Sequence, residues 1–426
     1  MKKVMLKTTL SLAVAMASSH VFASGFALNE QDVAGMGTGF AGRSSSADNA
    51  STVYGNPAGM ARLEGQQITG GVAAIDASTD IKDASGTGTA RGSNKGDMVP
   101  FTGVPFGFYT NKLNDQWAIG FGVYAPFGLV TDYEKGYQGR SFGSYSKVSV
   151  ITLQPTVSYA FNDRVSIGFG PTINRISGKL ESDLSFNPAL QDTNVTIKGD
   201  DTALGFNVGV LVQATDTTRV GLTYHSKVSY KLKGHTEVTA PTATAGLIAS
   251  GRYDASLKID TPESWDASVT QDLSDAWKVY GGATWTRWSR LKEITVNNEG
   301  VTAANGVAAP GVIGQINEPQ NWHDTWAYAL GTSYQVTKQV VLRTGLTWDQ
   351  SPTNNTDRSP RIPTGDRTIF SVGLGYAVMD NMTVDLAYSY LKEEPVKINK
   401  ANNLGSYSAK YENSANGFGL GVTYKF

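Results

Sequence analysis

The chain has 426 residues, with 36 Lys and Arg against 37 Asp and Glu, and it contains no cysteine. The near-neutral balance argues against a nucleic-acid partner, which would require a basic face. The lack of cysteine excludes a disulfide framework or a thiolate metal site. Gly occurs 47 times and Tyr 19 times, and beyond residue 24 no apolar run is long enough for a membrane-spanning helix. This composition is typical of an outer-membrane β-barrel.

The amino-terminal residues have the pattern of a cleaved export signal. Basic residues near the start precede an apolar run over about 8–17, and Val21-Phe22-Ala23 offers small or branched residues where a signal peptidase reads. A retained membrane anchor is the alternative, but the run is well short of the roughly 20 residues that a spanning helix needs. We predict a signal peptide over 1–23 and a mature chain that begins at Ser24.

Residues 24–65 are small and polar and do not alternate as strands do. They are too many for a simple tail and too polar to face lipid. Several later strands carry glycines on their inward face, which leaves room in the lumen. These inward glycines are Gly168, Gly170, Gly373, Gly375, Gly417, Gly419 and Gly421. We therefore predict an N-terminal hatch domain over 24–65 that plugs a barrel over 66–426.

Period-two alternation predicts the strands, because a lipid-facing barrel places apolar side chains at every second position. The last strand shows it most clearly, with apolar residues at 418, 420, 422, 424 and 426 and small or polar residues between them. We predict an all-β transmembrane barrel of fourteen antiparallel strands. Their expected starts are Gln66, Val99, Gln116, Tyr145, Val165, Thr202, Thr218, Tyr253, Trp277, His323, Gln339, Thr368, Met382 and Ser408.

The predicted connections alternate between short and long. Turn-forming residues mark short connections near 162–164, 216–217, 274–275, 337–339 and 380–381. Long connections lie near 78–98, 131–144, 184–201, 234–252, 297–321, 350–367 and 392–407. Because outer-membrane barrels keep their short turns on the periplasmic side, both ends of the barrel chain are expected there.

The last residue, Phe426, follows apolar residues two, four, six and eight positions before it. This pattern resembles the signal by which the barrel-assembly machinery recognises its substrates. An ordinary strand that happens to end in Phe is the alternative. The expected partners therefore include that machinery during biogenesis, beside the lipid and lipopolysaccharide of the outer membrane.

Four stretches carry a family resemblance. They are Ser24-Gly25-Phe26-Ala27-Leu28-Asn29-Glu30, Asn56-Pro57-Ala58, Pro126-Phe127-Gly128-Leu129 and Ser141-Phe142-Gly143. Together with the closing strand, they resemble the FadL family of outer-membrane long-chain fatty acid transporters, relatives of toluene and xylene uptake channels, over essentially the whole mature chain. The resemblance implies a hatch that plugs the barrel, a hydrophobic pocket for an acyl chain, and an outlet through the wall at a kink in the third strand.

The triplet Pro126-Phe127-Gly128 gives such a kink a physical cause. Pro126 cannot donate a hydrogen bond to the sheet and Gly128 has no side chain to pack, so the strand should bulge inward. The alternative is that Pro126 only marks the end of the strand near the rim. Lateral release would suit an acyl chain, which gains roughly 0.8 kcal/mol for each methylene kept out of water.

An anionic cargo requires a basic partner, and Arg can bind a carboxylate through two hydrogen bonds. Arg175 lies near the position at which the family places an arginine, offset by about two residues. Simple alternation directs Arg175 outward unless Pro171 introduces a bulge. An arginine at the rim that extends toward solvent is the alternative.

Further basic candidates lie on the seventh strand and before the tenth. The inward parity of the seventh strand holds His225, Lys227, Lys231 and Lys233. These side chains could attract the head group of the cargo, or pair with hatch carboxylates such as Glu30 and Asp32. Before the tenth strand, where family members use a second basic residue, the chain has Glu318 and Asn321-Trp322-His323. His323 has the inward parity and is the possible substitute.

The loops near 184–201 and 234–252 hold apolar residues in a polar frame. These residues are Leu184, Phe186, Leu190, Leu247 and Ile248. In the resembling family, loops at these positions form a capture groove, so Phe186 and Leu190 are expected to contact substrate. The alternative is that the apolar residues pack only on each other.

Three functions compete: a plugged channel for hydrophobic substrates, an open diffusion porin and an outer-membrane lipid hydrolase. The predicted plug favours the channel over the porin. No nucleophile motif accompanies the histidines, and no metal-ligand spacing stands out, so we predict neither catalysis nor a metal site.

No motif implies a cofactor or an energy source, so we expect passive diffusion of long-chain fatty acids, with aromatic hydrocarbons or alkanes as the alternative cargo. Substrate in the pocket is expected to shift residues 24–30 and so open the path to the wall.

Overall fold

The computed structural model describes residues 25–87, 92–186 and 189–426. The predicted signal peptide over 1–23 lies outside these residues, as do Ser24 and short parts of the predicted loops near 78–98 and 184–201. No helix in this part of the chain is long and apolar enough to cross a membrane.

The described chain consists mainly of strands. They are β1 (Gln66–Thr87), β2 (Thr102–Lys112), β3 (Trp117–Asp132), β4 (Tyr145–Ala160), β5 (Val165–Leu184), β6 (Thr193–Gln213), β7 (Thr218–His225), β8 (Val228–Thr239), β9 (Gly251–Thr261), β10 (Ser264–Asp272), β11 (Trp277–Thr286), β12 (Glu293–Asn298), β13 (Gln315–Pro319), β14 (Thr325–Gln335), β15 (Val340–Asp349), β16 (Arg367–Met379), β17 (Met382–Glu393), β18 (Val396–Asn402) and β19 (Gly405–Lys425). The helices are short: α2 (Val33–Gly37), α3 (Thr52–Gly55), η1 (Pro57–Arg62), η2 (Thr242–Thr244), η3 (Trp288–Arg290), η4 (Ala303–Asn305) and η5 (Pro310–Gly314).

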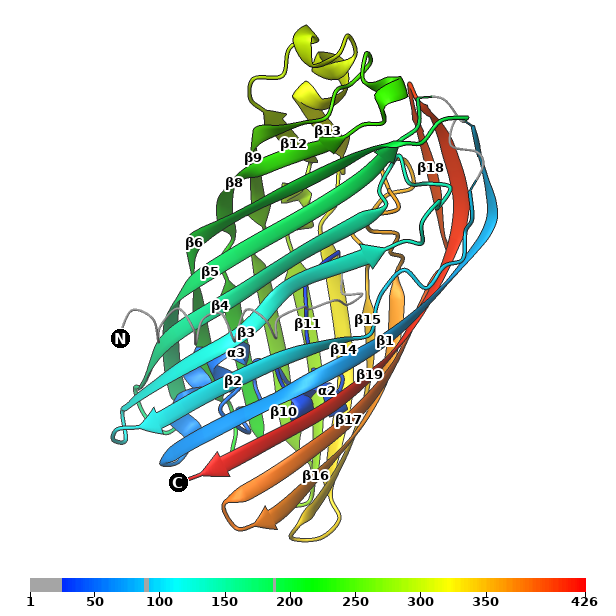
Figure 1. Ribbon diagram of the computed structural model, residues 1–426. Coiled ribbons are helices and arrows are strands. Elements are labelled where there is room, and N and C mark those ends of the chain that lie inside the picture. Colours follow the sequence, from blue (N-terminus) through cyan, green and yellow to red (C-terminus); the bar gives the residue numbers. More distant parts are fainter. Residues whose placement is uncertain (1–24, 88–91, 187–188) are drawn as a thin grey trace.

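The strands form one closed antiparallel barrel (Figure 1). Each strand pairs with its neighbours in the chain, and β1 pairs with β19 to complete the ring. Five barrel strands are interrupted and appear as two pieces each, namely β7 with β8, β9 with β10, β11 with β12, β13 with β14, and β17 with β18. The predicted all-β barrel of 14 antiparallel strands is therefore confirmed.

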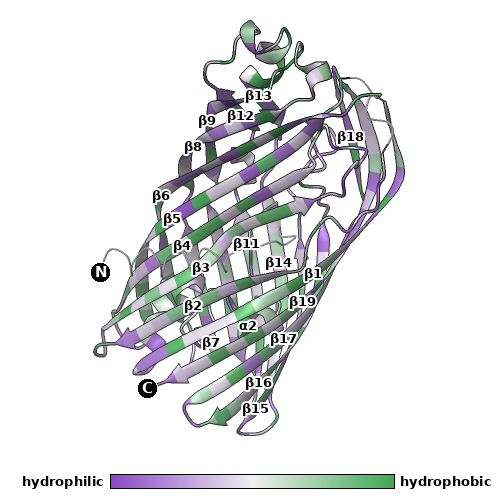
Figure 2. Ribbon diagram, in the orientation of Figure 1, coloured by the Kyte–Doolittle hydropathy of each residue, from purple (hydrophilic) through white to green (hydrophobic). Residues whose placement is uncertain are grey.

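The short turns and both ends of the barrel chain lie at one end, here called the lower end, and the long connections lie at the upper end (Figure 1). Apolar side chains face outward, as the alternation predicts. On β19, Phe418 and Leu420 are 49% and 50% exposed, while the alternating Gly417, Gly419 and Gly421 are buried. Hydrophobic residues recur along the lower parts of the strands (Figure 2). This exposed apolar band is the surface that lipid covers.

The predicted ranges of the long loops are partly wrong, because several strands continue into them above the apolar band. β1 extends to Thr87 and pairs with β19 up to that residue. β6 begins at Thr193 instead of Thr202, and β8 continues to Thr239. Backbone pairing continues here because polar side chains do not interrupt an antiparallel ladder whose partner strand is equally long.

Residues 25–65 contact strands around the whole ring. α2 contacts β1, β15, β16, β17 and β19, and η1 contacts β2, β3, β4, β5 and β6. The inner glycines make this approach possible: a Cβ atom added at Gly168 would lie 2.3 Å from Pro57, and one at Gly221 would lie 1.8 Å from Ser44. A segment that contacts the inner face on all sides of a closed barrel lies in its lumen. We call residues 25–65 the luminal segment.

Candidate functional site

The motif Asn56-Pro57-Ala58 attaches the luminal segment to the wall. The Asn56 side-chain amide donates to the backbone oxygens of Ser44 and Val210 at 2.7 and 2.9 Å. Its oxygen accepts from the Ala58 backbone N–H at 3.0 Å and so begins η1. A Cβ atom at Gly209 would lie 1.9 Å from the Asn56 side-chain oxygen. The motif therefore fixes the segment against β5 and β6 only because residue 209 is glycine.

β3 contains a bulge where the neighbouring strand leaves it. The register with β4 shifts between Tyr124 and Phe127, so that Ala125 and Pro126 occupy the length of one β4 residue. β2 pairs with β3 only up to Val123. Above this point, β3 has an edge that no strand of the wall covers.

The start of the luminal segment occupies that edge. Ala27 forms an antiparallel bridge with Phe127. The Leu28 N–H donates to the Pro126 oxygen at 2.8 Å, and the Gly128 N–H donates to the Phe26 oxygen at 2.9 Å. Residues 26–28 therefore act as a short additional strand at the bulge, so that displacing them would expose the edge of β3.

Four aromatic side chains gather beside this contact. The Phe26 ring centroid lies 4.9 Å from that of Trp288, 5.9 Å from that of Trp322 and 5.6 Å from that of Phe127. Gly25 has φ +63°, and a Cβ atom there would lie 2.5 Å from the Trp322 ring, so only glycine fits. We call Phe26, Phe127, Trp288 and Trp322 the aromatic cluster; its members pack in tilted and edge-on geometries that favour such contacts.

An apolar cavity lies inside the upper half of the barrel, between β4, β5, β6, β8, β9 and β12. Its empty space is about 600 Å³, part of which is open to solvent. Its wall residues are Val148, Ile176, Gly178, Leu180, Ile197, Lys198, Gly199, Leu232, Gly234, Ala255, Ser256, Leu257, Ile259, Ile294 and Val296. The Lys198 side chain is exposed on the outer face, so apolar groups dominate the inner surface of this upper cavity.

The upper cavity is continuous with apolar residues above and below it. Val148, Ile259 and Ile294 line it and also pack against the aromatic cluster. Ile197 lines it and also packs in a cluster formed by the upper loops. An apolar surface thus runs from the upper loops, through the cavity, to the bulge in β3.

The predicted capture residues differ in their surroundings. Phe186 packs in the upper loop cluster with fully buried residues such as Ile248. Leu190 and Leu247 are each 39% exposed. Mutual packing therefore holds for Phe186, while Leu190 and Leu247 face solvent, and contact of these residues with substrate stays a prediction.

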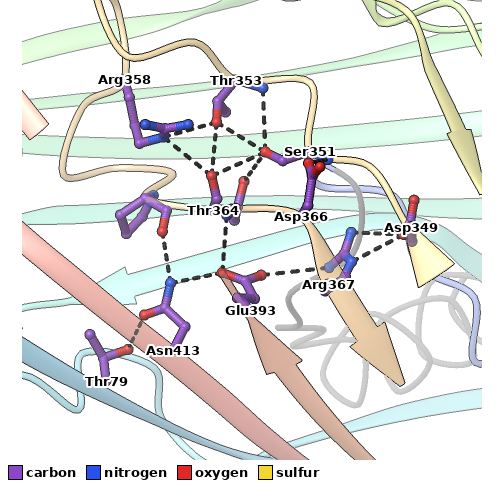
Figure 3. A network of polar contacts seen from close by, with 12 residues as sticks. Thr79, Asp349, Ser351, Thr353, Arg358, Thr364, Asp366, Arg367, Glu393 and Asn413 are labelled. Atoms are coloured by element: carbon purple, nitrogen blue, oxygen red, sulfur yellow. Dashed lines mark hydrogen bonds and ion pairs between the residues drawn. The ribbon is translucent and has the colours of Figure 1, made fainter. Parts of the chain in front are cut away.

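The connection over 350–366 folds into the upper mouth of the barrel and is largely buried. At one side of the mouth it joins a polar network with β1, β15, β16, β17 and β19 (Figure 3). Arg367 donates to Asp349 at 3.0 Å, while Asn413 donates to Glu393 at 2.8 Å and to the Pro363 oxygen at 2.7 Å. This network holds the base of the connection to adjacent strands.

The same connection reaches the opposite side of the mouth through Arg361. Its guanidinium donates to Glu318 at 3.1 Å, to the Ser146 hydroxyl at 2.9 Å and to the Ser182 hydroxyl at 2.8 Å. Ile362, next in the chain, packs on the aromatic cluster. Residues 350–366 therefore span the lumen directly above that cluster, and we call them the strap.

A second cavity lies below the aromatic cluster. Its empty space is about 1050 Å³, part of which is open to solvent, and it is bordered by Ala27, Glu30, Arg43 and inner-face residues of the wall. Arg43 donates to the Asn29 side chain at 3.0 Å and lies over the Phe40 ring at 4.8 Å. Within residues 25–87, 92–186 and 189–426, no ion pair to Arg43 is present. In this lower cavity the Arg43 guanidinium is thus held by an amide and an aromatic ring and not by any carboxylate that the structure describes.

One predicted alternative paired the seventh-strand lysines with Glu30 and Asp32 of the luminal segment, and the structure shows no such pairing among the residues that it describes. The Glu30 carboxylate accepts from the Asn29 N–H at 2.9 Å, and Asp32 accepts from the Gly35 N–H at 2.7 Å at the start of α2. Burial raises the pKa of both carboxyls, which lie in the luminal segment and not in a crossing strand. Asp32 is therefore the N-cap of α2, and Glu30 is held by the backbone N–H of the preceding residue.

Arg175 faces outward, which contradicts its assignment as a luminal ligand. Its side chain is 50% exposed and pairs with Asp200 at 2.9 Å. The register of β5 with β6 is uninterrupted across Pro171. Without a bulge, strict alternation keeps Arg175 on the outer face.

The inward placement of Lys227, Lys231 and Lys233 is also wrong. Lys231 and Lys233 are exposed, and Lys227 is 43% exposed and pairs with Asp260 at 3.5 Å. One extra residue separates β7 from β8 relative to their partner β6, as the pairs Asn207 with His225 and Asp200 with Lys233 show. This bulge reverses the parity of the upper piece, so that His225 alone of the four faces inward.

His323 is exposed, and Trp322 takes the buried position. Asn321 has φ +44°, a left-handed conformation that breaks the alternation before β14. The predicted parity was therefore off by one residue. The sequence contains no regular signal for the burial of Trp288 either, because it lies in η3 between two strands.

No group of three or more His, Asp or Glu side chains suited to a metal ion occurs in the part of the chain that the structure describes.

Comparisons with known proteins agree with this architecture. Residues 14–426 match the family model described as outer membrane protein transport protein (OMPP1/FadL/TodX). The long-chain fatty acid transport protein of Salmonella typhi is 29% identical, with 100% of this chain and 99% of that protein aligned. The crystal structure of a Pseudomonas aeruginosa FadL homologue is 26% identical with a TM-score of 0.83, covering 94% of this chain and 100% of that one. The Ralstonia pickettii toluene transporter TbuX shares the fold, at 17% identity and a TM-score of 0.68, covering 95% and 99%.

Proposed function

This chain belongs to the OMPP1/FadL/TodX family of outer-membrane transport proteins, and on that premise we propose that it takes up long-chain fatty acids by passive diffusion gated by the luminal segment. The cargo would leave through the wall at Pro126-Phe127-Gly128. Aromatic hydrocarbons or alkanes are the alternative cargo. An open porin is a weaker candidate, because the luminal segment and the strap fill much of the lumen.

One observation carries the proposal: the continuous apolar surface ends where residues 26–28 cover the free edge of β3. Cargo in the upper cavity would contact the aromatic cluster, of which Phe26 is part. Shifting Phe26 would strain the two backbone hydrogen bonds that hold residues 26–28 on β3. Entry of cargo and opening of the wall are thereby coupled through one short segment.

Release into the membrane is favoured by the cargo itself. Each methylene kept out of water contributes roughly 0.8 kcal/mol, so an acyl chain that moves from an apolar cavity to lipid avoids a large desolvation difference. Just below the bulge, the exposed residues Ile119 and Phe121 of β3 belong to the apolar band. A route downward would instead pass the polar contacts of Asn56, Ser44 and their neighbours.

The fatty acid is preferred over a hydrocarbon for two reasons. The Salmonella typhi relative, aligned over nearly its whole length, is named for long-chain fatty acids. Arg43, beside residues 27–30 in the lower cavity, offers a cation near the point at which a tail would reach the wall. Charge-assisted hydrogen bonds to a carboxylate are roughly twice as strong as neutral ones.

The bulge provides a direct test, because deleting Pro126 would restore one-to-one pairing of β3 with β4. The protein would be expressed in a strain that lacks its own outer-membrane fatty acid transporter, and uptake of labelled oleate measured. Wild type should restore uptake, and the deletion variant should fold but not restore it.

Pro105→Thr is the matched control, since Pro105 lies in a regular stretch of β2 and its replacement should leave uptake intact. Undiminished uptake by the deletion variant would refute lateral release. If wild type fails with oleate but takes up toluene or an alkane, the cargo is a neutral hydrocarbon.

A further inference from the structure

A row of lysines crosses the outer face of the upper barrel. In the strand register, Lys147 of β4 is directly opposite Lys179 of β5, and Lys179 is directly opposite Lys198 of β6. Lys198 is in turn opposite His235 of β8. Directly opposed residues of neighbouring strands project on the same face, where like charges destabilise the sheet.

A second opposed pair lies close to this row. Lys231 of β8 is directly opposite Lys258 of β9, and both side chains are exposed. Lys233, on the same face of β8, is opposite Ser256 of β9 and Asp200 of β6, and it is also exposed. We call Lys147, Lys179, Lys198, Lys231, Lys233 and Lys258 the outer basic patch.

Carboxylates on this face compensate only part of the charge. Glu181 contacts Lys179, and Asp200 is paired with Arg175 at 2.9 Å. Asp254 is opposite His235. Among the residues that the structure describes, Lys147, Lys198, Lys231, Lys233 and Lys258 form no ion pair. The patch therefore has an excess of unpaired cations in a position that costs stability.

The patch lies directly above the apolar band. On β5 the exposed residues Phe169 and Ile173 are followed by Arg175 and then Lys179, and on β6 Leu204 and Phe206 lie below Lys198. Phe206, Tyr224 and Trp265 form an outward-facing aromatic row at the top of the band. Aromatic rows of this kind mark the boundary between hydrocarbon and head groups. Hydrophilic residues recur along the upper β5, β6 and β8 (Figure 2).

From this placement we infer that the outer basic patch binds the phosphate groups of lipopolysaccharide in the outer leaflet. The acyl chains would lie on the apolar band below, and the phosphates would reach the lysine row. An ammonium group binds phosphate as a point charge, and a bound phosphate between opposed lysines would remove their repulsion. The inference depends on the location in the outer membrane and not on the identity of the transported cargo.

The test compares two charge-matched double variants purified from outer membranes in one mild detergent. Lys147→Gln/Lys198→Gln removes the two unpaired members of the row. Lys278→Gln/Lys338→Gln removes two lysines at the lower end and serves as the control. Lipopolysaccharide retained per barrel should fall about threefold or more in the patch variant and should equal wild type in the control. Equal retention by all three proteins would overturn the inference.

A second measurement separates a structural effect from a lost ligand. Each protein is refolded in micelles without lipopolysaccharide, and its thermal unfolding midpoint is measured. The patch variant should then unfold at or above the wild-type midpoint, because repulsion is relieved. Added lipopolysaccharide should raise the midpoint of wild type more than that of the variant.

Phosphatidylglycerol and inorganic phosphate are the comparison additives in this experiment. The inference requires that neither reproduces the rise seen with lipopolysaccharide. A lower midpoint of the variant in lipid-free micelles, with an unchanged response to lipopolysaccharide, would assign the lysines a structural role only.

Discussion

The two halves of the barrel share one continuous wall but differ in the side chains of its inner face and in what these side chains contact. In the lower half, glycines and hydroxyl residues of the inner face lie against the luminal segment, as in the contacts of Gly168 with Pro57 and of Ser44 with Ser268. In the upper half, Val, Ile and Leu side chains face a cavity. The lower half therefore contains the luminal segment with its polar contacts beside the lower cavity, and the upper half contains the upper cavity with its mainly apolar wall.

The difference shows how one sheet can both close a membrane and admit a hydrophobic molecule. Small inner residues allow a backbone to approach and exclude solvent. Where the inner face carries branched apolar residues, an unfilled space remains that an apolar cargo can occupy. The two halves meet at the bulge in β3, where Phe26 of the luminal segment contacts Phe127 of the wall.

A cross-link between the luminal segment and β3 at the bulge should have the largest effect on uptake. Ala27→Cys with Phe127→Cys places two cysteines at a bridged antiparallel position, a separation compatible with a disulfide. The chain has no other cysteine. Oxidised protein should lose oleate uptake, and reductant should restore it.

The control lock is Ser371→Cys with Ser389→Cys, which joins β16 to β17 within the wall and should leave uptake unchanged when oxidised. Full uptake by the oxidised 27–127 pair would show that residues 26–28 do not move during transport.

Filling the upper cavity should reduce transport without altering the lower half. A Cβ atom at Gly178 would lie 3.8 Å from Leu232, so Gly178→Leu should fold and project into the cavity. Uptake of oleate should fall about tenfold, because the added side chain displaces about two methylenes of the acyl chain, each of which contributes roughly 0.8 kcal/mol. Toluene, being smaller, should be affected less.

Gly107→Leu is the control, since a Cβ atom there meets nothing within 4 Å. Equal oleate uptake by both leucine variants would place the route outside the upper cavity.

Removing contacts that hold the strap should expose the upper mouth of the barrel. Arg361→Gln removes charged hydrogen bonds to Glu318, Ser146 and Ser182, each of which contributes about 1.5–3 kcal/mol. Trypsin should then cleave after Arg358 several times faster in outer-membrane vesicles. Arg252→Gln, at an exposed position, should leave cleavage unchanged. If strap cleavage is as slow in Arg361→Gln as in wild type, other contacts hold the strap.

The smallest expected effect, that of a substitution at Arg43, distinguishes a fatty acid from a neutral hydrocarbon as the cargo. Arg43→Gln should weaken oleate uptake a few-fold, as expected for a solvated ion pair that contributes about 0.2–1 kcal/mol. Uptake of toluene, which has no charge, should not change. Uptake assays with both labelled compounds would decide this, and an equal loss of both would indicate a displaced luminal segment instead of a lost ligand.

Local pattern in the sequence predicted most of the wall. Alternation predicted the outward face of β19, and an added Cβ atom at Gly168 or Gly417 would lie 2.3 Å from Pro57 or 2.9 Å from Met36. Alternation failed at Lys227 and His323, because a single extra or left-handed residue reverses parity and only the partner strand shows that this has happened.

The sequence by itself determined the fold class, the lipid-facing side of the strands and the outer-membrane location. Lipid requires apolar side chains at every second position, and each strand that crosses the membrane repeats this pattern. Tertiary structure decided the site. Trp288, Trp322 and Arg361 come from different connections, and the bulge in β3 matters only because residues 26–28, a hundred positions earlier, occupy its edge. Such contacts depend on register and long-range packing, which no local periodicity encodes.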